Sequence, residues 1–162
     1  MRTETGAATA LRRSRCGKPV PDQKRVTQVK KMPLKLALKP GEKIVINQAV
    51  IVNGGQKSEL VLENKASVLR ERDILTEEQA NSPAKRVYFA VQMLYLFPGN
   101  TAFYQEKFNT FTRDFIKAVP SASPIILEIG ENVIRGDLYG ALKKCRKLMK
   151  YEEEVLQNVA SA

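Results

Sequence analysis

The sequence predicts an α+β fold, in which a small antiparallel β-module precedes a domain of three to four helices. Short apolar runs with strand-like alternation or β-branched residues, separated by turn residues, occupy positions 34–74. After them, apolar residues recur at helical spacing. The change of period therefore predicts a β-module at 32–75, a helical region at 76–158 and a frayed tail at 159–162.

Turn residues divide the β-module into short strands. Pro40-Gly41 breaks the first, because proline lacks an amide donor and glycine tolerates turn dihedrals. Asn47-Gln48 separates two β-branched runs, and Asn53-Gly54-Gly55 is the strongest hairpin signal in the chain. The expected strands are 34–38, 43–46, 49–52, 60–62 and 66–70.

Capping signals mark where helices begin. Thr76-Glu77-Glu78-Gln79 fits a capping box, and Ser82-Pro83 offers a second start. Further helices are expected after Asn100 or Thr101, at Ser123-Pro124, and after Gly136-Asp137. The end of the last helix, Glu152–Glu154 and 157–162, is expected to fray.

Two features of the helical region admit a structural and a functional interpretation. Tyr104, Phe108, Phe111 and Phe115 recur at intervals of four, three and four, which favours a core stripe over a base-stacking ladder. The basic run 143–147 fits a solvated helix face, although it could also grip phosphates. Cys145 falls on the apolar side of the same helix, where a cysteine is usually a small core residue.

The charge of the chain is unevenly distributed. The net charge is +10, and residues 1–31 contribute +7 of it, from nine basic and two acidic side chains. This segment predicts a disordered basic extension, either an electrostatic arm for nucleic acid or a functionless extension, since Met32 directly precedes the first strand. No apolar run predicts a membrane span or signal peptide, and two distant cysteines favour a reducing bacterial cytoplasm.

Catalytic and cofactor signatures do not emerge from the sequence. The chain has no histidine, the commonest general base and metal ligand. Asn53-Gly54-Gly55 lacks the lysine and following helix of a phosphate loop. We therefore expect a protein that is not an enzyme and that needs no cofactor or metal.

Four segments resemble the FlbT family of bacterial flagellar post-transcriptional repressors. They are 32–44 (MPLKLALKPGEKI), 61–65 (VLENK), 68–75 (VLRERDIL) and 81–92 (NSPAKRVYFAVQ). The resemblance implies a cytoplasmic protein in flagellum biogenesis that binds the 5′ untranslated region of flagellin mRNA, represses flagellin synthesis and promotes mRNA decay. It also implies FlaF or flagellin as protein partners.

The β-module is also distantly similar to CsrA, a dimeric RNA-binding translational repressor. By motif position, Leu36 and Lys39 match that family's first-strand RNA contacts, and Val68 and Arg70 match its last-strand contacts. The planar guanidinium of Arg70 suits base edges exposed in single-stranded loops. The alternative for Arg70 is a surface ion pair with the neighbouring Glu71 or with Asp73.

Two function hypotheses follow. The first is an RNA-binding repressor that forms a homodimer by strand exchange or by pairing of strand edges, because apolar edge strands usually need a partner. The second is a protein-binding adaptor or chaperone that acts on flagellin or a flagellar regulator through the helical surface around Tyr88 and Tyr104.

Overall fold

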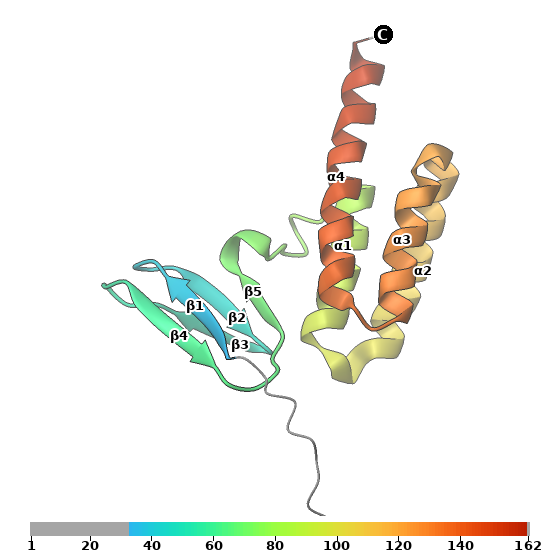
Figure 1. The fold of residues 1–162 in the computed structure, drawn as a ribbon. Coiled ribbons are helices and arrows are strands. Elements are labelled where there is room, and N and C mark those ends of the chain that lie inside the picture. The colour runs from blue at the N-terminus through green and yellow to red at the C-terminus, as the bar shows by residue number, and fades with distance from the viewer. Residues whose placement is uncertain (1–32, 162) are drawn as a thin grey trace, which may run out of the picture. The chain divides into compact units, whose positions relative to one another are not determined.

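The computed structural model describes residues 33–161 and has the predicted α+β architecture, with strands first and helices after them (Figure 1). The basic extension 1–31 and Cys16 lie outside the described residues. The strands are β1 (Leu34–Leu38), β2 (Lys43–Ile46), β3 (Ala49–Val52), β4 (Ser58–Leu62) and β5 (Val68–Arg70). The helices are α1 (Pro83–Leu96), α2 (Thr101–Ala118), α3 (Ser123–Ile134) and α4 (Leu138–Ala160), with short 3₁₀ turns at Glu71–Asp73, Pro98–Asn100 and Pro120–Ala122.

The five strands form two small antiparallel sheets. β1 pairs with β4, and β2 lies between β3 and β5. The apolar sides of the sheets share a core built on Leu36, Leu38 and Ile44, the last of which is fully buried. Alternation in β1 therefore buries one face of the strand, as its sequence predicts.

The hairpin turns differ in part from those expected. Asn47-Gln48 does join β2 to β3, and Asn47 has the positive φ of 56° that asparagine tolerates in tight turns. The prediction of a hairpin at Asn53-Gly54-Gly55 was wrong, because β3 and β4 belong to different sheets and do not pair.

Asn53 instead holds two loops together. Its Nδ2 donates to the carbonyls of Leu38, Lys39 and Gln56 at 3.3, 2.7 and 2.9 Å. Its Oδ1 accepts from the hydroxyl of Ser58 at 2.7 Å. One side chain thus links the turn after β1 to the loop that enters β4.

The first helix begins at the second of the two predicted signals. Ser82 caps α1 by accepting from the amide of Lys85 at 3.3 Å, and Pro83 occupies the first turn. The capping box at Thr76 forms its reciprocal bonds with Gln79, at 3.0 and 3.3 Å, yet only a turn follows. The helix start predicted at Thr76 was wrong: the turn covers only residues 77–79, and α1 begins at Pro83 after the extended Ser82.

Packing of the four helices confirms the core interpretation of the aromatic ladder. α1 packs against α2 and α4, and α3 packs against α4 (Figure 1). Phe108 and Phe115 are buried, while Tyr104 and Phe111 lie half-buried at the edge of the same core. Cys145 is fully buried, and burial raises the pKa of its thiol far above the ordinary value.

The sheet β3–β2–β5 and the helices share one hydrophobic core. Val45 and Leu69 belong to the same buried cluster as the helix residues. The hydroxyl of Tyr95 accepts from the amide of Val68 at 2.9 Å, and the Gln92 amide exchanges two 2.8 Å hydrogen bonds with the backbone of Leu75. These contacts fix β5 and the chain that follows it against α1.

The end of α4 is more ordered than the sequence predicts. The helix continues through Glu152–Glu154 to Ala160, so Glu152–Glu154 are helical and not frayed, while the fraying of 159–162 stays a prediction. Glu152 accepts from the Ser82 hydroxyl at 2.5 Å and from the Ala84 amide at 3.0 Å. A carboxylate at the start of α1 is favourable because free amides and the helix dipole attract negative charge there.

Candidate nucleic-acid interface

A basic depression lies where the end of β1 approaches β5. It has a volume of about 580 Å³. Its lining consists of Ala37, Leu38, Lys39, Glu42, Lys57, Arg70, Glu71 and Arg72. Four of these side chains are cationic and two are anionic, so the depression favours an anionic ligand.

Arg70 is held in place by the β1–β2 region. Its Nη1 donates to Glu42 Oε1 at 2.7 Å, and Nη1 and Nη2 both lie 3.2 Å from the carbonyl oxygen of Ala37. The alternative for Arg70, an ion pair with Glu71 or Asp73, does not form: Glu71 lies 3.8 Å from Lys43, and Asp73 lies 2.8 Å from Arg146. Arg70 thus ties β5 to the turn that precedes β2.

Glu42 is stabilised in its charged form by the same arrangement. The amide of Lys39 donates to Glu42 Oε2 at 2.9 Å, and Arg70 holds the other oxygen. These hydrogen bonds, the backbone one first, hold the pKa of Glu42 below its ordinary value.

The structure brings the four sequence-predicted residues together. Lys39 and Arg70 line the basic depression. Leu36, Val68 and Arg70 line a neighbouring hollow of about 380 Å³, which we call the middle hollow. Leu36 is only 8% exposed and packs in the sheet core, so its role is to position the strands that carry the exposed residues. The RNA contacts of these residues stay a prediction.

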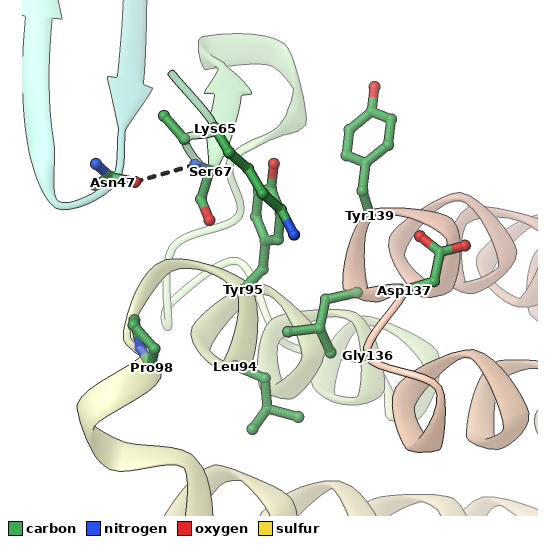
Figure 2. Close-up of a pocket in the computed structure, with 11 residues that line it drawn as sticks. Asn47, Lys65, Ser67, Leu94, Tyr95, Pro98, Gly136, Asp137 and Tyr139 are labelled. Atoms are coloured by element: carbon green, nitrogen blue, oxygen red, sulfur yellow. Dashed lines mark hydrogen bonds between the residues drawn. The ribbon is translucent and has the colours of Figure 1, made fainter. Parts of the chain in front are cut away.

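A chain of hollows continues from this point. Arg72 lines both the basic depression and the middle hollow, and Tyr95 and Tyr139 line both the middle hollow and a third one of about 460 Å³. We call the third the tyrosine hollow, and Figure 2 shows its residues. The full lining is Asn47, Lys65, Ala66, Ser67, Leu94, Tyr95, Pro98, Gly136, Asp137, Leu138 and Tyr139.

Several cations along these hollows are free to meet a ligand. Within residues 33–161, Lys39, Lys57 and Lys65 have no carboxylate within ion-pair distance. The side chain of Arg72 is 81% exposed, and its Nε lies 3.8 Å from Asp73 Oδ1. That carboxylate has a shorter contact, at 2.8 Å, with Arg146 of α4, which leaves the Arg72 guanidinium largely unengaged.

Sequence reasoning missed Arg72, Lys57 and Tyr139. Arg72 follows Arg70 by two residues, so a signal was present in the chain itself. Lys57 and Tyr139 lie outside β1 and β5 in the sequence, and only the fold places them at the basic depression and the middle hollow. No local pattern would have identified them.

Residues 33–161 contain no group of three or more acidic or cysteine side chains arranged to hold a metal ion. Each helix between residues 33 and 161 is either too short or too polar to span a lipid bilayer.

Comparison with known proteins gives one consistent result. The family model described as flagellar protein FlbT matches residues 34–156. A probable flagellum biosynthesis repressor protein FlbT 1 of Bradyrhizobium diazoefficiens is 48% identical over 125 residues, 76% of this chain and 85% of the relative. The flagellum biosynthesis repressor protein FlbT of Caulobacter vibrioides is 45% identical over 134 residues, 80% of this chain and 94% of the relative.

A more distant relative agrees. The probable flagellum biosynthesis repressor protein FlbT of Mesorhizobium japonicum is 32% identical over 125 residues, 76% of this chain and 84% of the relative. No solved structure matches. Because the family model and these relatives cover both the strands and the helices, the chain belongs to the FlbT family of flagellar proteins.

Proposed function

We propose that this chain is a non-enzymatic, post-transcriptional repressor of flagellin synthesis. It associates with the 5′ untranslated region of flagellin mRNA and promotes degradation of that mRNA. Relatives named flagellum biosynthesis repressors support the repressor role. The basic depression beside β1 and β5 supports RNA as the ligand.

The free cations of the depression are the observation that carries the proposal. Lys39 and Lys57 are exposed and Arg72 is 81% exposed, so all three can reach phosphates without breaking an internal pair at close range. The Arg72 fork can also take a base edge in two parallel hydrogen bonds. Single-stranded loops expose such edges, whereas paired A-form RNA hides them in a deep groove.

Arg70 contributes in a different way from Arg72. Most of its N–H donors bind Glu42 and the carbonyl of Ala37, so Arg70 mainly fixes the position of β5 relative to β1 and the turn before β2. The loss of Arg70 would therefore weaken RNA binding and also loosen β5.

The test is RNA binding by the full chain. A labelled flagellin 5′ leader is titrated at about 50 and 200 mM salt with wild type, Arg72→Ala and Lys57→Ala. We expect each variant to bind more weakly and to lower the salt slope by about 0.7, the value for one lost phosphate contact on a single strand. Arg113→Ala, which removes an exposed arginine of α2, is the matched control and should bind like wild type.

Absence of leader binding by wild type, or equal binding by all four proteins, would refute RNA binding at this site. The decay step is tested separately, in cells, by the half-life of flagellin mRNA with wild type and with Arg72→Ala. A shorter half-life with wild type alone supports the proposal, whereas equal half-lives would remove mRNA degradation from it.

A groove between α1 and α2, lined by aromatic residues together with Glu77, Arg86 and Lys107, favours a second candidate function, an adaptor that binds flagellin or a flagellar regulator. It has a volume of about 650 Å³, and Phe89, Phe103, Tyr104 and Phe111 line it. Phe103 is 56% exposed, so its ring is accessible to a partner. Tyr88, expected on this surface, is instead 3% exposed, and its hydroxyl donates to the carbonyl of Asp73. Phe103→Ser would abolish partner binding and leave RNA binding unchanged.

Partner proteins complete the proposal. The β3 strand forms one edge of its sheet, with Val50 and Val52 65% and 58% exposed. An exposed apolar edge of this kind can pair with the same edge of a second copy, which supports a homodimer. FlaF or flagellin remain the proposed protein partners on the helical side.

A further inference from the structure

The tyrosine hollow combines an exposed aromatic ring with free cations. Tyr139 is 42% exposed, and its ring centroid lies 6.1 Å from that of Tyr95 at an interplanar angle of 42°. In Figure 2 the Tyr139 ring extends away from α4 beside the hollow. Tyr95 is fixed by its hydrogen bond from Val68, so it forms a rigid wall next to the more exposed ring.

Two lysines border this pair of rings. Lys65 lines the hollow and Lys143 lies with its Nζ 4.8 Å from the centroid of Tyr139. Neither has a carboxylate within ion-pair distance among residues 33–161. An exposed lysine over an aromatic ring is a weaker contact than a stacked base, so a base can displace Lys143 and free it for a phosphate.

The acidic and polar groups of the hollow are compatible with an RNA ligand. The carboxylate of Asp137 accepts from the amide of Gly140 at 2.9 Å and caps α4, so that helix start is not a free phosphate site. Asn47 uses its Oδ1 to accept from the amide of Ser67 at 3.0 Å, as Figure 2 shows. Its Nδ2 has no acceptor among the described residues and can donate to a base carbonyl.

The tyrosine hollow also continues the surface proposed to bind RNA. Tyr95 and Tyr139 line the middle hollow together with Arg70 and Arg72, and these two arginines line the basic depression. A backbone that follows the cations from Lys57 through Arg72 to Lys65 therefore passes the exposed ring. Cationic grooves interrupted by aromatic rings are the usual way to bind single-stranded nucleic acid.

We propose that Tyr139 stacks on an unpaired base of the bound RNA, with Lys65 and Lys143 on the adjacent phosphates. This inference rests on the proposed RNA-binding function and extends the site from the β-module onto α4. The helical half then takes part in RNA binding directly, and the ligand is single-stranded where it crosses the hollow.

The chain contains no tryptophan, so a single introduced tryptophan reports on the hollow without background. Tyr139→Trp keeps an aromatic ring at the position, and we expect its emission to be quenched when the full-length protein is titrated with the flagellin 5′ leader. Phe103→Trp, at an exposed aromatic position lining the α1–α2 groove, is the matched control, and its emission should not change.

Affinity measurements complete the test. Tyr139→Ala should weaken leader binding about tenfold with an unchanged salt slope, because a stacked base but no phosphate contact is lost. Lys65→Ala should lower the slope by about 0.7. Circular dichroism melting of each variant checks that the fold is retained.

The outcomes separate this inference from the function on which it rests. Leader binding by wild type, with an unquenched Tyr139→Trp and an unchanged affinity of Tyr139→Ala, would overturn the stacking role and leave the RNA-binding function standing. No binding by wild type would overturn both.

Discussion

Asn53 offers a sharp test of how the loops around the basic depression are held. Asn53→Ala removes the side-chain bonds to Leu38, Lys39, Gln56 and Ser58. The Nδ2 group has only two protons for three carbonyls, so the four contacts amount to roughly three hydrogen bonds. At about 0.5–1.5 kcal/mol each, and with most of them exposed, the expected loss of unfolding free energy is about 2 kcal/mol.

The assay is urea-induced unfolding followed by circular dichroism, with thermal melting beside it. A loss of this size corresponds to a melting temperature lowered by roughly 6 °C for a chain of this length. Asn64→Ala is the control, since Asn64 is exposed in the bend after β4 and makes no side-chain hydrogen bond within the described residues. It should unfold within about 0.5 kcal/mol of wild type.

Asn53→Asp distinguishes the effect of the hydrogen bonds that Nδ2 donates from the effect of side-chain packing. The substitution preserves the shape but turns an oxygen toward three carbonyls, so at neutral pH we expect a loss at least as large as that of Asn53→Ala. Because those carbonyls disfavour the charge, the pKa of the new carboxyl is raised, and part of the loss should be recovered as pH falls below it. Equal stability of Asn53→Ala and Asn64→Ala would refute the linking role of Asn53.

Three further predictions concern the helices, the sheet edge and pH. Glu152→Ala should cost about 1–2 kcal/mol of unfolding free energy, because α1 loses two capping contacts, while Glu153→Ala, on an exposed position, should cost nothing measurable in the same melts. Val52→Lys should convert the proposed homodimer to monomer in light scattering; a dimer that persists would place the interface elsewhere. Because the pKa of Glu42 is lowered in the folded state, its contribution to stability is present above the ordinary carboxyl pKa and is lost as pH falls through the folded value. The stability difference between wild type and Glu42→Gln should therefore shrink on acidification, and a difference independent of pH would contradict the assignment.

Local signals predicted those parts of the fold that local physics determines. The turn at Asn47-Gln48, the cap at Ser82 and the helix start at Ser123 depend on residues within a few positions of one another, and all three are confirmed. The aromatic stripe of α2 was also interpreted correctly, because helical spacing alone places its members on one face.

Contacts between distant segments account for the errors. Asn53-Gly54-Gly55 has the sequence of a hairpin turn, but β4 pairs with β1 in one sheet while β3 pairs with β2 in the other. Arg70 pairs with Glu42 and not with an acidic neighbour, and Glu152 is ordered by α1. Periodicity and turn chemistry carry no information on such pairings, so they could not be anticipated.

The candidate site divides along the same line. Motif position identified Lys39 and Arg70, which line the basic depression, and Leu36, Val68 and Arg70, which line the middle hollow; their contacts with RNA stay a prediction. The surface continues onto α4 because Tyr139 and Tyr95 meet there, and that meeting depends on helix packing.

The single core shared by β2, β5 and the helices has a consequence for the energetics of binding. Val45 and Leu69 are packed within the helical cluster, so opening of this sheet exposes helix side chains as well. We therefore expect the backbone amides of β2 and β5 to exchange with solvent deuterium as slowly as those of α1, as one cooperative foldon. A ligand that binds β5 and α4 together would slow this exchange further. A substitution that leaves a cavity in the helical core would then lower the affinity for that ligand, although it changes no residue that contacts the ligand.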